Sequence, residues 1–163
     1  NEWENRLGTR TKPRVGLVWS GNSTHKNDHN RSVRLEEILP HLNPSIEWHS
    51  LQKEYREYDL ALLNQHPEIH QHQDDLHDFM ETGGLVEQMD LIIAVDTSVA
   101  HLAGALGKPL WILLPYVPDY RWLLDRDDTP WYPSATLYRQ DESRVWTGVI
   151  NKIREELRNR LSV

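Results

Sequence analysis

The chain has 163 residues, of which 38% are hydrophobic and 26% charged, a composition typical of a globular protein with a hydrophobic core. The net charge of -7, without long runs of Lys or Arg, argues against general binding of nucleic acid or anionic membranes. There is no cysteine, which excludes disulfides and thiolate metal sites, and no apolar run of about 18 residues that would span a membrane, so we expect a cytoplasmic protein.

Strand and helix patterns alternate along the chain. Apolar and β-branched runs predict strands at residues 14–21, 45–52, 68–73, 90–96, 109–115 and 135–140, the last at a sheet edge. Amphipathic spacing predicts helices at 35–42, 55–64, 78–89, 99–106 and 146–161, with Pro40 ending the first of them early. This alternation predicts an α/β fold: a Rossmann-like parallel sheet with helices on both faces, spanning residues 14–163. Residues 1–13 are set apart as a linker or N-terminal extension.

Ligands of such sheets bind beyond the carboxyl ends of the strands, so the residues after each strand are the informative ones. Ser20, Gly21 and Asn22 follow the first strand, and Lys26 comes shortly after. A glycine turn with neutral donors and a cation suits a diphosphate. The alternative is a solvated loop, since these residues are common in turns and match neither the dinucleotide-binding nor the Walker fingerprint.

The second predicted strand ends at Gln52, and Lys53 and Glu54 follow it. An acidic residue at this place often holds ribose hydroxyls in doubly wound folds, which makes Glu54 the candidate. Gln52 and Lys53 are candidates to face the same ligand. A Lys–Glu pair that decorates a helix start is the alternative.

Asp96, Thr97 and Ser98 end the fourth strand, and His101 follows four residues after Thr97. Thr97 or Ser98 can cap the next helix, whose first turn presents N–H groups and a partial positive charge to an anion. His101 lies off the apolar stripe of that helix, on a face that continues through Gly104 and Ala105, which are small enough to predict the close approach of another element. His101 can donate to a phosphate oxygen, or it can be hydrogen-bonded to Asp96 or a carbonyl for structural reasons. The spacing of these residues favours neither the ligand-binding role nor the structural role of His101.

The segment 116–134 is rich in aromatic and charged residues. Asp119, Tyr120 and Arg121 are candidates to contact a ribose, base or sugar, whereas Trp131–Tyr132 is interpreted as packed structure. A domain interface would explain the same composition.

Four histidines gather between the second and fourth strands: His66, His70, His72 and His77. His70 and His72 would share one face of a strand, which could support a metal. No matching cluster occurs elsewhere, so exposed histidines in a polar loop are the preferred interpretation and no metal site is predicted.

Several segments together resemble a known family: "RVGLVWSGN" (14–22), "NDHNRSVRLEEILP" (27–40), "SLQKE" (50–54), "DFMETGGLVEQMDLIIAVDTSVAHLAGALGKP" (78–109) and "PDYRWLLDRDDTPWYPS" (118–134). They resemble the heptosyltransferase-type glycosyltransferases, and more closely the C-terminal half of bacterial tetratricopeptide-repeat proteins with a glycosyltransferase-like end. The resemblance covers nearly everything from Arg14 onward.

The resemblance implies one half of a GT-B fold, the half that binds a nucleotide-sugar donor. It implies that Lys26 meets the diphosphate, Glu54 lies near the ribose, and Asp96–Thr97–Ser98 with His101 holds the phosphates. No metal or other cofactor is implied, because a lysine, a histidine and a helix N-terminus can neutralise a leaving diphosphate.

Two departures qualify the match. Gly83–Gly84 stands where helix formers are expected, at a cost of about 1 kcal/mol per glycine. The second Rossmann-like half, which carries the acceptor site, is missing. The chain is therefore expected to be a donor-binding half. Its expected ligand is a nucleotide sugar or a nucleoside diphosphate, and its expected protein partners are the N-terminal half and the repeat domain of the parent protein. A non-catalytic interaction module with a vestigial nucleotide site is the alternative, and a histidine-based metallohydrolase is a third.

Overall fold

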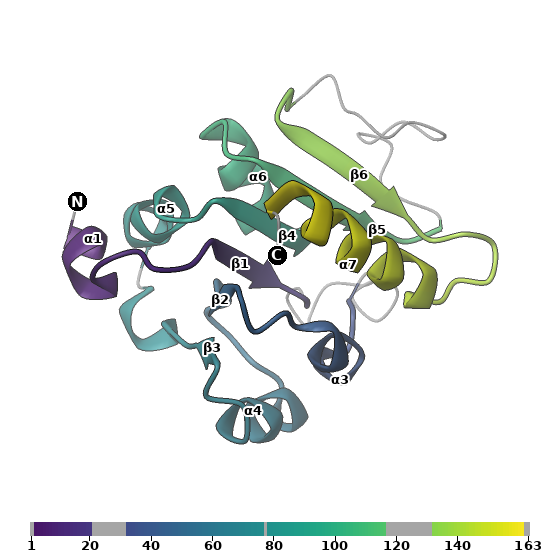
Figure 1. The fold of residues 1–163 in the computed structure, drawn as a ribbon, viewed down its shortest axis with the longest axis horizontal. Coiled ribbons are helices and arrows are strands. Elements are labelled where there is room, and N and C mark those ends of the chain that lie inside the picture. The colour runs from purple at the N-terminus through teal and green to yellow at the C-terminus, as the bar shows by residue number, and fades with distance from the viewer. Residues whose placement is uncertain (1, 21–31, 77, 117–131, 162–163) are drawn as a thin grey trace.

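The computed structural model describes residues 2–20, 32–76, 78–116 and 132–161. It contains a six-stranded sheet with helices on both faces (Figure 1). The strands are β1 Arg14–Val18, β2 Glu47–Ser50, β3 Ile69–His70, β4 Leu91–Val95, β5 Leu110–Leu114 and β6 Ala135–Arg139. All six predicted strands are therefore confirmed, each shorter than its apolar run.

The helices follow the predicted order. They are α1 Glu2–Leu7, α3 Leu35–Ile38, α4 Glu57–Asn64, α5 Phe79–Glu87, α6 Ser98–Ala105 and α7 Thr147–Leu161, with short 3₁₀ turns η1 Leu39–His41 and η2 Gln73–Asp75. Pro40 lies within η1, so the first predicted helix ends early, as expected. Asp78 caps α5 by accepting from Glu81 N at 2.9 Å, as the spacing of this pair predicts.

Every pair of neighbouring strands in the sheet is parallel, and the strand order is β3-β2-β1-β4-β5-β6. The prediction of a parallel, Rossmann-like sheet is confirmed. The chain builds outward from β1 through β2 to β3 and then returns to place β4 on the other side of β1. The order thus reverses between β1 and β4, and a crevice at their carboxyl ends is where sheets of this kind bind ligands.

Two separate layers of side chains cover the sheet. On one face, Leu17, Trp48 and Ile93 pack with residues of α3, α4 and α7. On the other face, Val18, Ile92 and Ile112 pack with residues of α1, α5 and α6. The central strands β4 and β5 are buried along their whole length, which explains why they read as continuous apolar runs.

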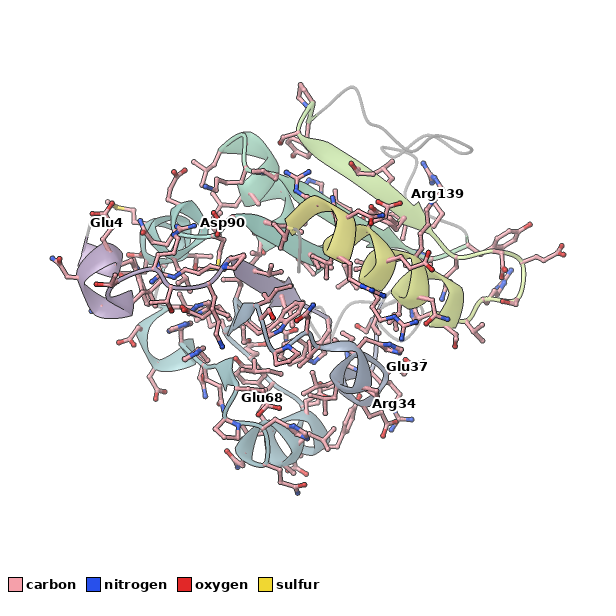
Figure 2. The ribbon with its side chains drawn as sticks, viewed as in Figure 1. Glu4, Arg34, Glu37, Glu68, Asp90 and Arg139 are labelled. Carbon is pink, nitrogen blue, oxygen red and sulfur yellow. The ribbon has the colours of Figure 1, made fainter. Side chains whose placement is uncertain are left out.

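The N-terminal segment that the sequence set apart contains α1. Trp3 is 3% exposed and belongs to the core layer beside α5. Arg10 forms an ion pair with Asp90, and Asp90 Oδ2 also accepts from Arg14 N at 2.8 Å; Asp90 is labelled in Figure 2. A short polar helix with a single tryptophan carries too little periodicity to be recognised from sequence.

Among the described residues, no helix combines the length and the apolar content that crossing a bilayer requires.

Candidate functional site

The candidate site is the crest formed by the carboxyl ends of β1 and β4, which pair up to Val18 and Ala94. At this point the chain leaves β1 and β4 toward opposite faces of the sheet, because α3 packs in one core layer and α6 in the other. This divergence keeps the ends of both strands from being covered by the same helix.

The start of α6 lies at the crest. Thr97 is its N-cap: its hydroxyl donates to Val95 O at 3.2 Å and accepts from Ala100 N at 3.5 Å. The N–H groups of Ser98 and Val99 have no intrahelical acceptor, because the first turn of a helix provides none. The cap residue is as predicted, and the helix start can present two N–H donors and the positive end of its dipole to an anion.

His101 is held from both sides. Its Nε2 lies 2.9 Å from Asp96 Oδ1, and its Nδ1 lies 2.9 Å from the hydroxyl of Tyr132. If the Asp96 carboxylate accepts from Nε2–H, then Nδ1 accepts from the Tyr132 hydroxyl. The structure therefore contains the hydrogen bond between His101 and Asp96 that a structural role of His101 predicts. The side chain remains 23% exposed, so contact with a ligand is sterically open.

Tyr132 reaches His101 because Gly104 leaves room for its ring. A Cβ atom at position 104 would lie 2.5 Å from Cγ of Tyr132, well inside contact distance. The sequence predicted a close approach at Gly104 and a structural role for Tyr132, and both are confirmed. Trp131, assigned with Tyr132, lies outside the described residues.

Gln52 joins the ends of β1 and β2. Its Oε1 accepts from Trp19 N at 2.7 Å and Ser20 N at 3.0 Å. Its Nε2 donates to Ser20 Oγ at 3.1 Å and to the carbonyl of Glu54 at 3.2 Å. The amide thus holds the crest with both its oxygen and its nitrogen, and a contact of Gln52 with a ligand stays a prediction. Lys53 and Glu54 are exposed, and their contact with a ribose stays a prediction.

A second glutamine, which sequence reasoning missed, does the same for β5 and β6. Gln140 N donates to Leu114 O at 2.9 Å, Tyr116 N donates to Gln140 Oε1 at 3.0 Å, and Gln140 Nε2 donates to Arg144 O at 3.1 Å. Arg144 has a φ of 58°, a left-handed conformation that this bond helps to hold. A glutamine as the last residue of a predicted strand was the available signal.

Asp59 was also missed. It reaches under the crest from α4, where its Oδ2 accepts from Trp19 Nε1 at 3.0 Å. The side chain is buried, and this burial raises the pKa of Asp59 against the opposing effects of the Trp19 bond and nearby arginines. The contact fixes the indole that follows β1.

Six of the predicted site residues lie outside the described residues: Gly21, Asn22, Lys26, Asp119, Tyr120 and Arg121. Their assigned contacts with diphosphate, ribose, base or sugar stay predictions. The described part of the site brings together Ser20 with Gln52, and Asp96 with His101.

The histidine-rich segment forms no metal centre in the part of the chain that the structure describes, where no group of three or more metal-ligating side chains is suitably placed. His72 Nε2 instead lies 2.9 Å from His49 Nδ1, and His66 Nδ1 lies 2.7 Å from Glu68 Oε1. His77 lies outside the described residues.

No protein-family model matches the chain. A curated protein, Protein FlbA of Caulobacter vibrioides, is 26% identical over 154 residues. That alignment covers 90% of this chain and 25% of FlbA, so the chain spans about a quarter of the length of this relative.

Proposed function

We propose that the chain is a nucleotide-diphosphate-sugar-binding domain, the donor-binding half of a GT-B glycosyltransferase that transfers a sugar to a hydroxyl acceptor. The observation that supports this most is the reversal of strand order at the carboxyl ends of β1 and β4, where the N-terminus of α6 begins. That juxtaposition suits a diphosphate, since the helix N-terminus favours anions and ligands of such sheets bind where the strand order reverses.

Rigidity at the crest supports the same proposal. The buried amides of Gln52 and Gln140 tie together the carboxyl ends of neighbouring strands on both sides of β4. A binding edge that is fixed before the ligand arrives loses less conformational entropy on binding. The resemblance of residues 95–109 to a donor-binding signature is the sequence counterpart of this arrangement.

The bond between His101 and Asp96 also favours a second candidate, a non-catalytic interaction module with a vestigial nucleotide site. In the neutral ring, both nitrogens of His101 already have protein partners. A histidine held in this way must exchange a partner or gain a proton before it can donate to a phosphate.

Titration calorimetry with UDP, GDP, ADP and their sugar conjugates tests the proposal. We expect one nucleotide to bind, and amide NMR shifts to change at Ser98, Val99 and His101. His101→Ala should weaken binding by about 1–3 kcal/mol if the contact is charge-assisted. The matched control is His66→Ala, on a histidine that pairs with Glu68 away from the crest.

The two candidates give different results. Binding that His101→Ala weakens and His66→Ala leaves intact supports the donor-binding domain. A folded protein that binds no nucleoside diphosphate, with no shift in thermal midpoint across the panel, contradicts it and supports the interaction module.

A further inference from the structure

A chain of buried and half-buried polar side chains crosses the face of the sheet that α1 covers. Arg14 Nε donates to Glu47 Oε1 at 3.1 Å, and His49 Nε2 lies 2.7 Å from the same oxygen. The other ring nitrogen of His49, Nδ1, lies 2.9 Å from His72 Nε2. His49 is only 1% exposed, so its hydrogen bonds are made almost without water.

The carboxylate of Glu47 sets the direction of these hydrogen bonds. Burial alone would raise the pKa of Glu47, but the His49 hydrogen bond and the charges of His49 and Arg14 outweigh it and lower that pKa. An ionised carboxylate can only accept, so His49 carries its proton on Nε2 and its Nδ1 accepts. His72 must therefore donate from Nε2. The bond between the imidazoles survives one added proton but not two, because with two protons both His49 Nδ1 and His72 Nε2 carry hydrogen and neither can accept.

Both imidazoles resist protonation. Burial lowers the pKa of His49 from 6.5 to about 4; the Glu47 hydrogen bond opposes this and the charge of His70 adds to it. Burial, followed by the charges of His49 and His70, lowers the pKa of His72 from 6.5 to about 4 as well. The folded arrangement therefore excludes protons that free imidazoles would accept.

The surrounding charges are of both signs and do not outweigh the effect of burial on the two imidazoles. Arg14 and Arg6 face the pair with positive charge, and Glu47 and Asp75 face it with negative charge. The His70 ring stacks on His49 with centroids 4.8 Å apart. One proton can be shared between Nδ1 and Nε2 if His72 changes tautomer. Two protons place two N–H donors and two like charges 2.9 Å apart, which the geometry forbids.

The same residues attach α1 to the domain. The Trp3 ring meets the His72 ring edge to face at 5.3 Å, and Arg6 pairs with Asp75 of η2 at 3.7 Å. Arg14 Nη2 donates to the carbonyls of Leu7 at 3.3 Å and Gly8 at 3.0 Å, at the end of α1. A movement of His72 away from His49 therefore removes one of the surfaces on which α1 rests.

We propose that the His49–His72 pair is an acid-operated latch, in which double protonation drives His72 off His49 and releases α1 and η2 while β4 and β5 stay folded. The central strands have no part in the latch: they are buried along their length in the layers on either side of the sheet. The latch is independent of the proposed nucleotide site, which lies at the carboxyl ends of the strands.

Hydrogen exchange of the native chain, followed by mass spectrometry between about pH 7 and pH 4.5, tests the latch. After correction for the intrinsic exchange rate, the opening equilibrium of α1 and η2 should rise about 2-fold from pH 7 to pH 6.5 and about 50-fold from pH 6 to pH 5, because opening takes up nearly two protons below the free pKa of 6.5. Peptides from β4 and β5 should stay more protected than those from α1 and η2 throughout this range, because they exchange only on global unfolding. His72→Gln retains a donor for His49 Nδ1 but cannot titrate, so its opening should rise only about 7-fold from pH 6 to pH 5.

His66→Gln is the matched control, since His66 bonds to Glu68, labelled in Figure 2, outside the latch. It should keep the wild-type pH dependence. The latch is overturned if α1 opens without pH dependence, if β4 and β5 open together with α1, or if His66→Gln changes the slope as His72→Gln does. Imidazole ¹⁵N shifts at neutral pH give a second check, because a proton on Nδ1 of His49 contradicts the bond directions.

Discussion

Replacing Gly104 by alanine tests how closely Tyr132 approaches α6. The new Cβ would lie 2.5 Å, 2.6 Å and 2.8 Å from three atoms of the Tyr132 ring. Carbon atoms pack best at about 3.5–4.0 Å, so the ring must withdraw by about 1 Å. That withdrawal also lengthens the 2.9 Å contact between the Tyr132 hydroxyl and His101 Nδ1.

The expected magnitude combines three effects. Overpacking costs about 1–3 kcal/mol, and loss of the hydrogen bond costs about 0.5–1.5 kcal/mol. Alanine stabilises the helix relative to glycine by about 1 kcal/mol. We therefore expect Gly104→Ala to lower the free energy of unfolding by between about 0.5 and 3.5 kcal/mol.

Gly83→Ala in α5 is the matched control. Its Cβ would have one neighbour within 4 Å, Leu106 Cδ1 at 3.9 Å, which is ordinary contact. Only the helix term applies, so this variant should gain up to about 1 kcal/mol. Urea unfolding followed by circular dichroism measures both. If the two alanines stabilise the protein equally, the Tyr132 ring does not rest on Gly104 and the account of His101 positioning is wrong.

Two further predictions concern buried polar groups. Gln52→Ala removes the acceptor of Trp19 N and Ser20 N and should destabilise the fold by about 2–4 kcal/mol in urea unfolding. Lys53→Ala, at the exposed neighbouring position, should change the stability by less than about 0.5 kcal/mol, and equal effects would mean that the amide is not what holds the crest. Acid should also weaken the whole fold. The pKa of His49 falls from 6.5 to about 4 on folding, so the folded state favours the neutral imidazole. The free energy of unfolding therefore decreases as the pH falls from about 6.5 to about 4. By pH 5 the loss from this one group reaches about 2 kcal/mol, and a pH-independent urea midpoint between pH 7 and pH 5 would contradict it.

Part of the site was accessible from the sequence because it depends on neighbours along the chain. Thr97 caps α6, and Asp96 follows a strand that is apolar on both faces. These features follow from residues a few positions apart, and local hydrogen-bonding rules identify them. The small residue at Gly104 signalled a close approach in the same way, although it did not name Tyr132 as the partner.

What the sequence by itself determined is the alternation of strands and helices, the parallel sheet and the edge where a ligand is expected. Only the tertiary structure decided which polar groups meet: Gln52 with Trp19, and His49 with Glu47 and His72. Periodicity records which face of an element is buried, but the partners of a buried polar atom depend on register between strands. The pairing of Gly16 with His49, and of His49 with His70, is such a register, and a shift by one residue would turn His49 to the opposite face of the sheet.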